Sequence, residues 1–435
     1  MKKALVINMK HENSKKLCDK FSNYLPKENS YEKISTLNTI EYDYLYIVNF
    51  DNITVKKLED IFTKKNEHFF IKTDNFNDKE LEDLCIAYEN ATYVFKIDKT
   101  YQEIESNLSF DIENDAIKKA LIIAQAMSVC KTLINKPSNE LTINSFAEFL
   151  HMLANENNLD FSEIYKKELI ERNAGGIIAV NKGSKEDAKV VILKYHGNKK
   201  SDEKYILVGK GLIFDTGGYS LKSTSNIVSM KSDMGGAATM AAVISGVSKL
   251  NLNLNIEVII PITDNLINEN AYRPDDVIEF MNGITTEIIS TDAEGRLILA
   301  DSLVLASKSK PKLIIDAATL TGAVVNALGD ITTGVFGNDS NNINQLINCS
   351  NSVDEYAWQL PINDYPRDLI KGKVATLKNS ASPAGASTAA AFLENFIGDN
   401  NWIHLDIAGS SWSNKTGATG AMVRPLIKFF TEKED

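Results

Sequence analysis

Strand-like apolar segments alternate with helix-like segments from residue 177 onward in this 435-residue chain. The predicted strands span residues 177–180, 190–195, 205–208, 256–260, 288–289, 313–316 and 402–405. Because strands alternate with helices, the pattern predicts an α/β fold with a mixed, mainly parallel sheet flanked by helices. Ligands of such sheets bind outside the carboxyl ends of the strands, so residues that follow strands are the first candidates for a functional site.

A smaller α/β domain is predicted for residues 1–115. Strands are expected at 4–9, 42–49, 69–73 and 91–97, with helices near 14–24, 53–64 and 78–89. An apolar stripe at helical spacing over residues 117–134 predicts a long helix, which Pro137 ends. A chain of this length can bury the cores of two domains. We therefore expect an N-terminal α/β domain (1–115), a connecting helix (116–140) and a larger domain (141–435).

The octapeptide STDAEGRL at residues 290–297 places Asp292, Glu294 and Arg296 at alternate positions. In an extended segment these side chains leave the chain on one side, whereas on a helix Asp292 and Glu294 would point about 200° apart. A strand-like run precedes them and apolar residues at helical spacing follow, which predicts a strand-to-helix turn. Such turns often carry the functional groups of α/β enzymes. The alternative is a solvated turn whose acids favour the positive end of a helix.

A second stretch, residues 208–236, sets Lys210, Asp215 and Asp233 among glycine and apolar residues. Charges in such surroundings are costly unless they are paired or bind a metal. Few cations lie nearby to neutralise these two carboxylates together with Asp292 and Glu294. A pair of divalent cations would relieve the repulsion among the four, and Lys210 could otherwise form an ion pair with Asp215.

Other kinds of catalytic site fit the sequence poorly. The glycines around Lys210 lack the spacing of a phosphate-binding loop. No Gly-x-Ser-x-Gly nucleophile motif is present, and the five histidines are too scattered for a histidine-rich zinc site. Three hypotheses stay open: metal-assisted hydrolysis of peptides, metal-assisted hydrolysis of phosphoesters, and a noncatalytic binding protein on the same scaffold.

Composition narrows the class of protein further. The net charge of −11, from 47 basic and 58 acidic residues, disfavours nonspecific binding to nucleic acid. No apolar run approaches the ~20 residues of a membrane span, and the first residues, MKKALVIN, are too short for a signal peptide. The four cysteines are scattered, as is typical of reduced thiols. We therefore predict a cytoplasmic protein that binds neither membranes nor nucleic acid.

Several blocks of the sequence resemble the leucyl aminopeptidase family, the cytosolic aminopeptidases that use two metal ions. The octapeptide matches the family pattern at every position except Ser290, where asparagine is usual. Further matches, in the family's order, are NKPSN at 135–139, DAATLTGA at 316–323, WIHLDIAG at 402–409 and GATG at 417–420. The resemblance runs from residue 135 to the C-terminus and assigns the catalytic role to the larger domain.

The resemblance implies two divalent metal ions per chain, with zinc or manganese favoured over cobalt or magnesium. It assigns one ion to Lys210, Asp215, Asp233 and Glu294, and the other to Asp215, Asp292 and Glu294. It also implies two catalytic cations: Lys222 would stabilise the oxyanion of the reaction, and Arg296 would hold a bicarbonate anion together with Gly295 and Leu320. The pocket for the first side chain of the substrate would be lined by Met230, Thr319, Gly322 and Ala408.

The implied activity is removal of an N-terminal residue, preferably hydrophobic and leucine-like, from short peptides with a free N-terminus. The family is hexameric, so a homo-oligomer, and in particular a hexamer, is expected. Three positions depart from the family pattern: Ser290, Asp275 in place of glycine, and Thr376 in place of aspartate. None of the three matches a metal ligand, so we expect them to affect substrate preference and assembly more than catalysis.

Overall fold

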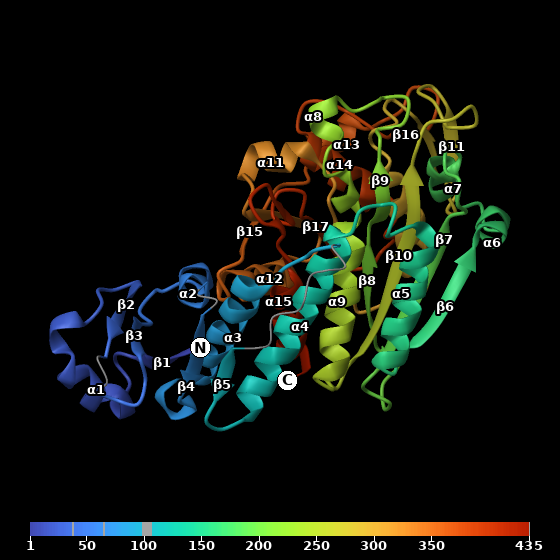
Figure 1. Cartoon of the computed structure of the whole chain (residues 1–435). Coiled ribbons are helices and arrows are strands. Elements are labelled where there is room, and N and C mark those ends of the chain that lie inside the picture. Colours follow the sequence, from blue (N-terminus) through green and yellow to red (C-terminus); the bar gives the residue numbers. More distant parts are fainter. Residues whose placement is uncertain (37–38, 64–65, 98–106, 435) are drawn as a thin grey trace. The chain divides into compact units, whose positions relative to one another are not determined.

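The computed structural model describes residues 1–36, 39–63, 66–97 and 107–434 (Figure 1). The chain divides into two compact units, Met1–Ser128 and Val129–Asp435. The division falls within a single long helix, α4 (Asp115–Asn135), so one regular element belongs partly to each unit.

The first unit is built around a five-stranded sheet in the order β2-β3-β1-β4-β5. All neighbouring strands are parallel except the pair formed by β2 and β3. The elements are β1 (Lys2–Asn8), η1 (Glu12–Ser14), α1 (Lys15–Lys20), η2 (Ser22–Tyr24), β2 (Ser30–Ser35), β3 (Tyr44–Asn49), α2 (Val55–Phe62), β4 (Glu67–Ile71), η3 (Thr73–Asn75), α3 (Asp78–Thr92) and β5 (Leu108–Phe110). The predicted strand at 91–97 is wrong, because α3 continues to Thr92 and β5 takes the place beside β4.

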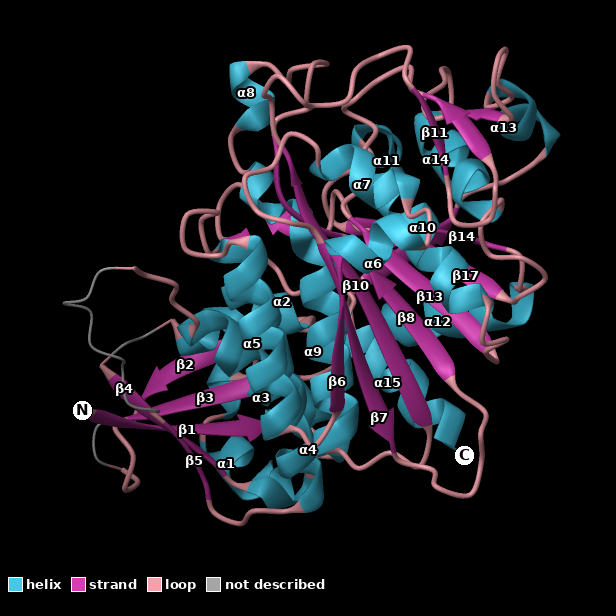
Figure 2. Ribbon diagram, turned by 90° about the vertical axis from the view of Figure 1, so that its right-hand side faces the viewer, coloured by secondary structure: helices cyan, strands magenta, loops and turns pink. Residues whose placement is uncertain are grey.

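The second unit contains a nine-stranded sheet in the order β15-β14-β17-β13-β8-β10-β7-β6, with β9 pairing to β10 (Figure 2). Its strands are β6 (Asp160–Tyr165), β7 (Lys189–His196), β8 (Tyr205–Gly209), β9 (Gly211–Asp215), β10 (Asn255–Asn265), β13 (Leu313–Ala318), β14 (Thr332–Gly337), β15 (Tyr356–Gln359) and β17 (Trp402–Asp406). The central strands β17, β13, β8 and β10 are mutually parallel, whereas β14 against β17, β7 against β10 and β6 against β7 are antiparallel. The predicted mixed, mainly parallel sheet is therefore confirmed.

Helices cover both faces of this sheet. Every residue of β8, β13 and β17 is buried, as expected for strands covered on both sides. Ile206 and Val208 of β8 join a core that includes α10 (Gly295–Ser307) and α14 (Gly385–Glu394). The alternate position, Gly209, faces Ala237 of α9 (Gly235–Lys249) on the opposite side. The candidate site residues predicted from the sequence lie at the carboxyl ends of the central strands, between these two helix layers.

The remaining elements of the second unit are short or lie around the sheet. The helices are α5 (Ile143–Glu156), α6 (Lys166–Glu171), α7 (Gly175–Asn181), α8 (Thr224–Ile227), η4 (Met230–Met234), α11 (Gly322–Leu328), α12 (Ser340–Asn351), α13 (Asp364–Leu369) and α15 (Val423–Glu434). Two small sheets are formed by β11 (Val277–Glu279), β12 (Thr285–Glu287) and β16 (Leu377–Lys378), and by β18 (Trp412–Ser413) and β19 (Gly417–Ala418).

Two strand predictions for this unit need correction. Residues 177–180 lie in helix α7, not in a strand, because the buried carboxylate of Asp301 accepts a hydrogen bond from the Ile177 backbone N–H at 3.0 Å and caps the helix. Gly176 permits the close packing, since a Cβ there would lie 2.2 Å from the Leu297 carbonyl oxygen. Residues 288–289, predicted as a strand of the large sheet, do not lie in a strand. The strand before them, β12, ends at Glu287 and belongs to the small sheet with β11 and β16.

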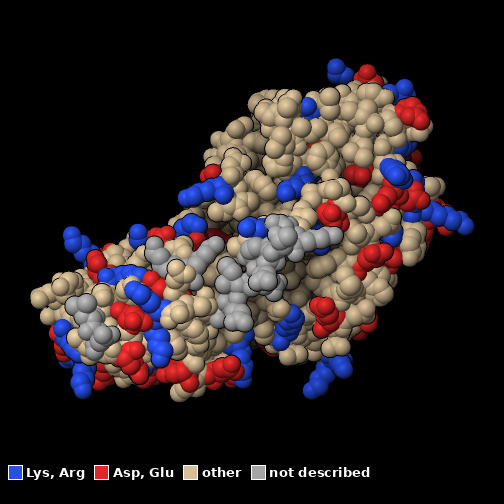
Figure 3. Space-filling model, viewed as in Figure 1, with Lys and Arg blue, Asp and Glu red and all other residues tan. Residues whose placement is uncertain are grey.

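Acidic and basic side chains are interspersed over the face drawn in Figure 3. No helix within the described ranges combines the length and the apolar character needed to cross a bilayer. The four cysteines are buried and unpaired. Burial raises the pKa of Cys85 and Cys130 to about 12, which keeps both thiols in the weakly reactive protonated form.

Candidate functional site

The predicted ligands gather at the carboxyl edge of the central strands. Lys210 lies between β8 and β9, and Asp215 is the last residue of β9. Asp233 lies in η4, just before α9. Asp292 and Glu294 lie in the segment between β12 and α10, which we call the acidic turn (residues 288–294). The predicted strand-to-helix turn is thus confirmed, and segments up to about 80 residues apart in the sequence converge.

We call the carboxylates of Asp215, Asp233, Asp292 and Glu294 the carboxylate cluster. Lys210 is the buried cation at one side of this cluster. Only 2% of its side-chain surface is exposed. Its Nζ donates hydrogen bonds to both carboxylate oxygens of Asp233 at 2.8 Å and to the Thr319 carbonyl oxygen at 2.9 Å, and it lies 3.1 Å from Glu294 Oε1. Burial by itself would lower the pKa of Lys210, but Asp233, Glu294 and Asp215 together raise it above the usual lysine value. Its direct ion-pair partners are therefore Asp233 and Glu294 rather than Asp215.

Gly295 makes room for this lysine. A Cβ atom at Gly295 would lie 2.5 Å from Lys210 Cε and 2.6 Å from Lys210 Nζ. A Cβ atom essentially never lies that close to a nonbonded atom, so a side chain there would displace Lys210 from the carboxylates. The glycine of the octapeptide is thus required by the close approach of a residue 85 positions earlier in the chain.

Lys222 neutralises the other side of the cluster. Its Nζ lies 2.7 Å from Asp215 Oδ2 and 2.6 Å from Asp292 Oδ1, and 15% of its side chain is exposed. Burial opposes the charge, but Asp215 and Glu294 hold the pKa of Lys222 above its usual value. The side chain therefore reaches the cluster from the solvent side as an ammonium group.

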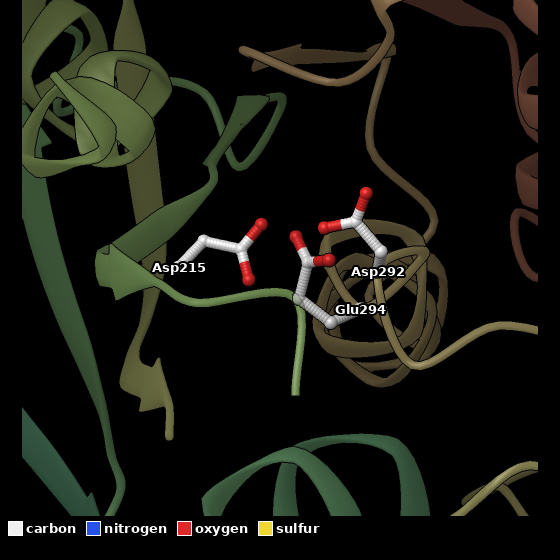
Figure 4. Close-up of side chains that lie close together, drawn as sticks. All are labelled: Asp215, Asp292 and Glu294. Atoms are coloured by element: carbon white, nitrogen blue, oxygen red, sulfur yellow. The ribbon is translucent and has the colours of Figure 1, made fainter. Parts of the chain in front are cut away.

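Three carboxylates face one another at the centre of the site (Figure 4). Oxygen atoms of Asp215, Asp292 and Glu294 all lie within 4.8 Å of one another, and among the described residues this is the group of acidic, histidine or cysteine side chains that could hold a metal ion. Glu294 Oε2 is buried, and no described residue donates a hydrogen bond to it. A buried carboxylate oxygen without a donor is costly, so this atom fits a cation.

The pKa shifts of the four acids reflect their burial first and their charged neighbours second. Burial, together with Glu294, raises the pKa of Asp215 to about 8, and burial raises the pKa of Asp233 to about 6. Burial also raises the pKa of Asp292. Burial opposes ionisation of Glu294 too, but Lys210 and Lys222 hold its pKa below the usual value. Four carboxylates thus share two lysines, and hard oxygen donors of this kind suit divalent cations.

Arg296 lies at the start of α10 with its guanidinium buried. Its Nη1 donates a hydrogen bond to the Asn379 carbonyl oxygen at 2.7 Å, and its Nε is buried without a partner within the described ranges. Burial lowers the pKa of Arg296 to about 10, and Glu294 and Asp406 oppose that shift. A buried guanidinium with an unused donor is chemically suited to a small anion.

The residues predicted to form the substrate pocket lie around the same edge. Thr319 Oγ1 donates a hydrogen bond to Asp233 Oδ1 at 2.7 Å. Met230 is the first residue of η4, which also carries Asp233. Gly322 begins α11, and a Cβ atom added there would meet nothing within 4 Å. Thr319 is thus in direct contact with the cluster, and Gly322 borders open space.

Asp406 connects two further predicted residues, Leu320 and Ala408. Its Oδ1 accepts hydrogen bonds from the backbone N–H groups of Leu320 and Ala408, both at 3.2 Å, and its Oδ2 accepts one from Thr321 Oγ1 at 2.6 Å. This carboxylate is the last residue of β17 and is almost fully buried. Asp406 therefore holds together the loops that follow β13 and β17, on which the predicted site residues Leu320 and Ala408 lie.

Two supporting residues were not identified from the sequence. Asn265, the last residue of β10, donates hydrogen bonds to Asp215 Oδ1 at 2.8 Å and to the Thr291 carbonyl oxygen at 2.9 Å. Thr291 Oγ1 donates to the Gly217 carbonyl oxygen at 2.6 Å and accepts from the Ser220 N–H at 2.7 Å. The hydrogen bonds of Thr291 join the acidic turn to the loop that carries Lys222, and those of Asn265 join the turn to Asp215. The position of Asn265 at a strand end was a usable signal.

Each departure from the family pattern has a local consequence. Ser290 Oγ accepts a hydrogen bond from the Asp292 N–H at 3.2 Å, so serine provides an acceptor within the turn. Asp275 has φ of 72°, a left-handed conformation that glycine adopts more easily. Thr376 Oγ1 lies 3.3 Å from Thr285 Oγ1, and this contact joins the start of β12 to the start of β16.

The fold and the site together define an α/β enzyme with a buried, carboxylate-rich site suited to metal. The chain belongs to the cytosol aminopeptidase family, since residues 128–427 match the model of the family's catalytic domain. The resemblance seen in the sequence is thereby confirmed, and the chain is a peptidase by family.

Relatives and solved structures agree with this assignment. The chain is 40% identical over 368 residues to the probable cytosol aminopeptidase of Bacillus subtilis (strain 168). The aligned residues cover 81% of this chain and 74% of the relative. The bottromycin maturation enzyme BotP shares the fold, with a TM-score of 0.86, 26% identity and 99% of both chains covered. BotP in complex with Mn has a TM-score of 0.87 and 26% identity, covering 100% of this chain and 99% of the other.

Proposed function

We propose that this chain removes the N-terminal residue from short peptides with a free N-terminus, with a preference for hydrophobic, leucine-like residues. The observation that carries the proposal is the convergence of the Asp215, Asp292 and Glu294 carboxylates, since Glu294 Oε2 is buried and has no hydrogen-bond partner among the described residues. Membership in the aminopeptidase family supports the reaction, and the BotP complex with Mn supports metal dependence.

We assign the ligands as the resemblance implies. Lys210, Asp215, Asp233 and Glu294 would hold one divalent ion, and Asp215, Asp292 and Glu294 would hold a second, with zinc or manganese favoured over cobalt or magnesium. When bound, a pair of such ions supplies an acidified water and a binding point for the free amine. Lys210 must give up its proton to act as a ligand, and nearby dications favour that loss.

Lys222 and Arg296 have separate roles in this proposal. The Lys222 ammonium is held by Asp215 and Asp292 at the solvent side of the cluster, where it would stabilise the oxyanion that develops on the scissile carbonyl. Arg296, with the backbone of Gly295 and Leu320, would hold bicarbonate, and its Nε, which has no hydrogen-bond partner in the described part of the chain, is one donor suited to such an anion. The anion would then relay a proton.

The substrate pocket is assigned to Met230, Thr319, Gly322 and Ala408. These side chains are small or apolar apart from the Thr319 hydroxyl, which is already bonded to Asp233. The open space beside Gly322 leaves room for a substrate side chain. A hydrophobic first residue is therefore favoured.

We expect the purified chain to hydrolyse a leucyl anilide with added manganese, zinc or cobalt and to lose this activity in a chelator. The N-acetylated anilide should resist, because its amine cannot bind a metal. The two alternative functions are a metal-dependent phosphoesterase and a noncatalytic binding protein. Hydrolysis of a phosphodiester but not of the anilide would favour the first, and hydrolysis of neither with any of the three metals would favour the second.

We further propose that the active form is a cytoplasmic homohexamer. A closed assembly would limit access to short, flexible peptides and spare folded proteins. Light scattering at micromolar concentration should then give a mass near six times that of the 48.2 kDa chain, and activity should fall with peptide length. A fully active monomer would refute the assembly while leaving the chemistry intact.

A further inference from the structure

The acidic turn needs support from outside its own segment. Residues 289–293 lie after β12 and before α10, so neither a sheet nor a helix provides partners for all of their backbone groups. Buried backbone N–H and C=O groups are nearly always paired in folded proteins. The conformation of this turn decides where the Asp292 and Glu294 side chains point, so its partners matter for the site.

The side chain of Asn379 provides four of these partners. Its Oδ1 accepts hydrogen bonds from the backbone N–H groups of Ile289 at 2.8 Å and Ser290 at 3.3 Å. Its Nδ2 donates to the carbonyl oxygens of Ser290 at 2.6 Å and Ala293 at 3.3 Å. A carboxamide has two donors and two acceptor sites, and here all four are used on residues 289–293. Two N–H groups on one side and two carbonyls on the other also fix the orientation of the amide.

The backbone of Asn379 contacts the segments on either side of the turn. Its N–H donates to the Glu287 carbonyl oxygen at 3.1 Å, at the end of β12. Its carbonyl oxygen accepts the bond from Arg296 Nη1 at 2.7 Å, at the start of α10. Asn379 is fully buried. One residue thus binds both flanks and the interior of the acidic turn.

The segment that presents Asn379 is itself held in place. Leu377 and Lys378 pair with β12 in parallel register. The carboxylate of Glu287 accepts hydrogen bonds from three successive backbone N–H groups, those of Lys373, Val374 and Ala375. A support can only position another group when it is fixed itself, and these contacts meet that condition.

We propose that Asn379 is a positioning residue of the active site, which holds the acidic turn in the conformation that turns Asp292 and Glu294 toward Asp215 and that fixes Arg296. This inference rests on the proposed function, because that proposal makes Asp292 and Glu294 metal ligands. Asn379 acts through these residues and does not itself belong to the carboxylate cluster.

The test measures Mn²⁺ binding by calorimetry to the full chain and to three variants. Asn379→Ala should weaken Mn²⁺ binding by about 10–100-fold, as is typical for residues that orient metal ligands, and should lower kcat at saturating Mn²⁺. Asn379→Asp keeps the acceptor oxygen, loses both N–H donors and adds a negative charge. A charge effect alone would tighten Mn²⁺ binding, whereas loss of positioning should weaken it.

Asn157→Ala is the matched control. Asn157 is also a buried asparagine of the second unit, and its side chain bonds to the Leu153 carbonyl oxygen at 2.7 Å and to Ser245 Oγ at 3.0 Å. Its loss should lower the melting temperature but leave Mn²⁺ affinity and kcat within about twofold of the wild type, because distant independent sites rarely couple.

Each outcome decides the proposal. Wild-type Mn²⁺ affinity in both Asn379 variants would overturn it, as would failure of both to fold, which would make Asn379 a residue of the fold alone. Equal losses in Asn157→Ala would show a general effect of destabilisation and overturn it too. If the wild type binds Mn²⁺ but cleaves no peptide, the proposed function fails while the affinities still test Asn379. Absence of Mn²⁺ binding by the wild type would overturn both.

Discussion

Glu294→Ala is expected to abolish measurable peptidase activity and to remove most of the bound metal. Glu294 is buried, its Oε1 lies 3.1 Å from Lys210 Nζ, and its Oε2 has no hydrogen-bond partner among the residues that the structure describes. In the proposed assignment it contacts both ions, so one substitution weakens two sites. The loss should exceed the about 10–100-fold effect typical of residues that only orient a ligand. Metal content by mass spectrometry and the rate on a leucyl anilide measure both effects.

Glu257→Ala is a suitable control for this variant. Glu257 is also a buried glutamate of the second unit, but it lies near the start of β10, eight residues before Asn265, and pairs with Lys204 at 2.8 Å. Its loss should leave metal content and rate unchanged. If Glu294→Ala kept two ions and the wild-type rate, the carboxylate cluster would not be the site of the reaction.

Lys222→Ala is expected to keep the metals and lose rate. The substitution removes a positive charge that lies 2.7 Å from Asp215 and 2.6 Å from Asp292, so the remaining cluster is more negative and should bind divalent cations at least as well. If Lys222 stabilises the oxyanion, kcat should fall by a factor on the order of 10²–10³, as for other oxyanion donors. Metal content and kcat, measured on the same preparation, separate the two effects.

Lys204→Ala controls for loss of a partly buried lysine with a carboxylate partner. Lys204 precedes β8, at the end of the strand opposite to Lys210, and pairs with Glu257. This variant should retain the wild-type kcat. An empty metal site in Lys222→Ala, combined with full occupancy in Glu294→Ala, would reverse the roles assigned to these two residues.

Much of the second unit was predictable because its signals are local. The buried apolar runs of β8, β10, β13 and β17 were located near their observed positions, since a strand covered on both faces needs a continuous apolar run. The position of β7 was also predicted, although only part of that strand is buried. The strand-to-helix turn at 288–294 was predictable because a strand-like run precedes it and apolar residues at helical spacing follow it. The family resemblance predicted more of the candidate site than any local pattern did, because several blocks of the sequence match the family in the same order.

The failures occurred where a distant residue decides the local structure. Residues 177–180 have strand-like composition but form a helix, because Asp301, more than 120 residues later, caps its first turn. Residues 91–97 are apolar enough for a strand, but β5 takes the place beside β4. Composition and periodicity describe a segment in isolation, whereas its final structure depends on which neighbours bury it.

The sequence by itself determined the class of fold, the residue types of the candidate site and the turn on which Asp292 and Glu294 lie, since these follow from spacing within short segments. Only the tertiary structure decided that Lys210 pairs with Asp233 and Glu294, that Gly295 must lack a side chain to admit it, and that Asn379 holds the acidic turn. The physical reason is that hydrogen bonds and steric contacts join atoms close in space, and here their residues lie about 20 to 90 positions apart in the chain.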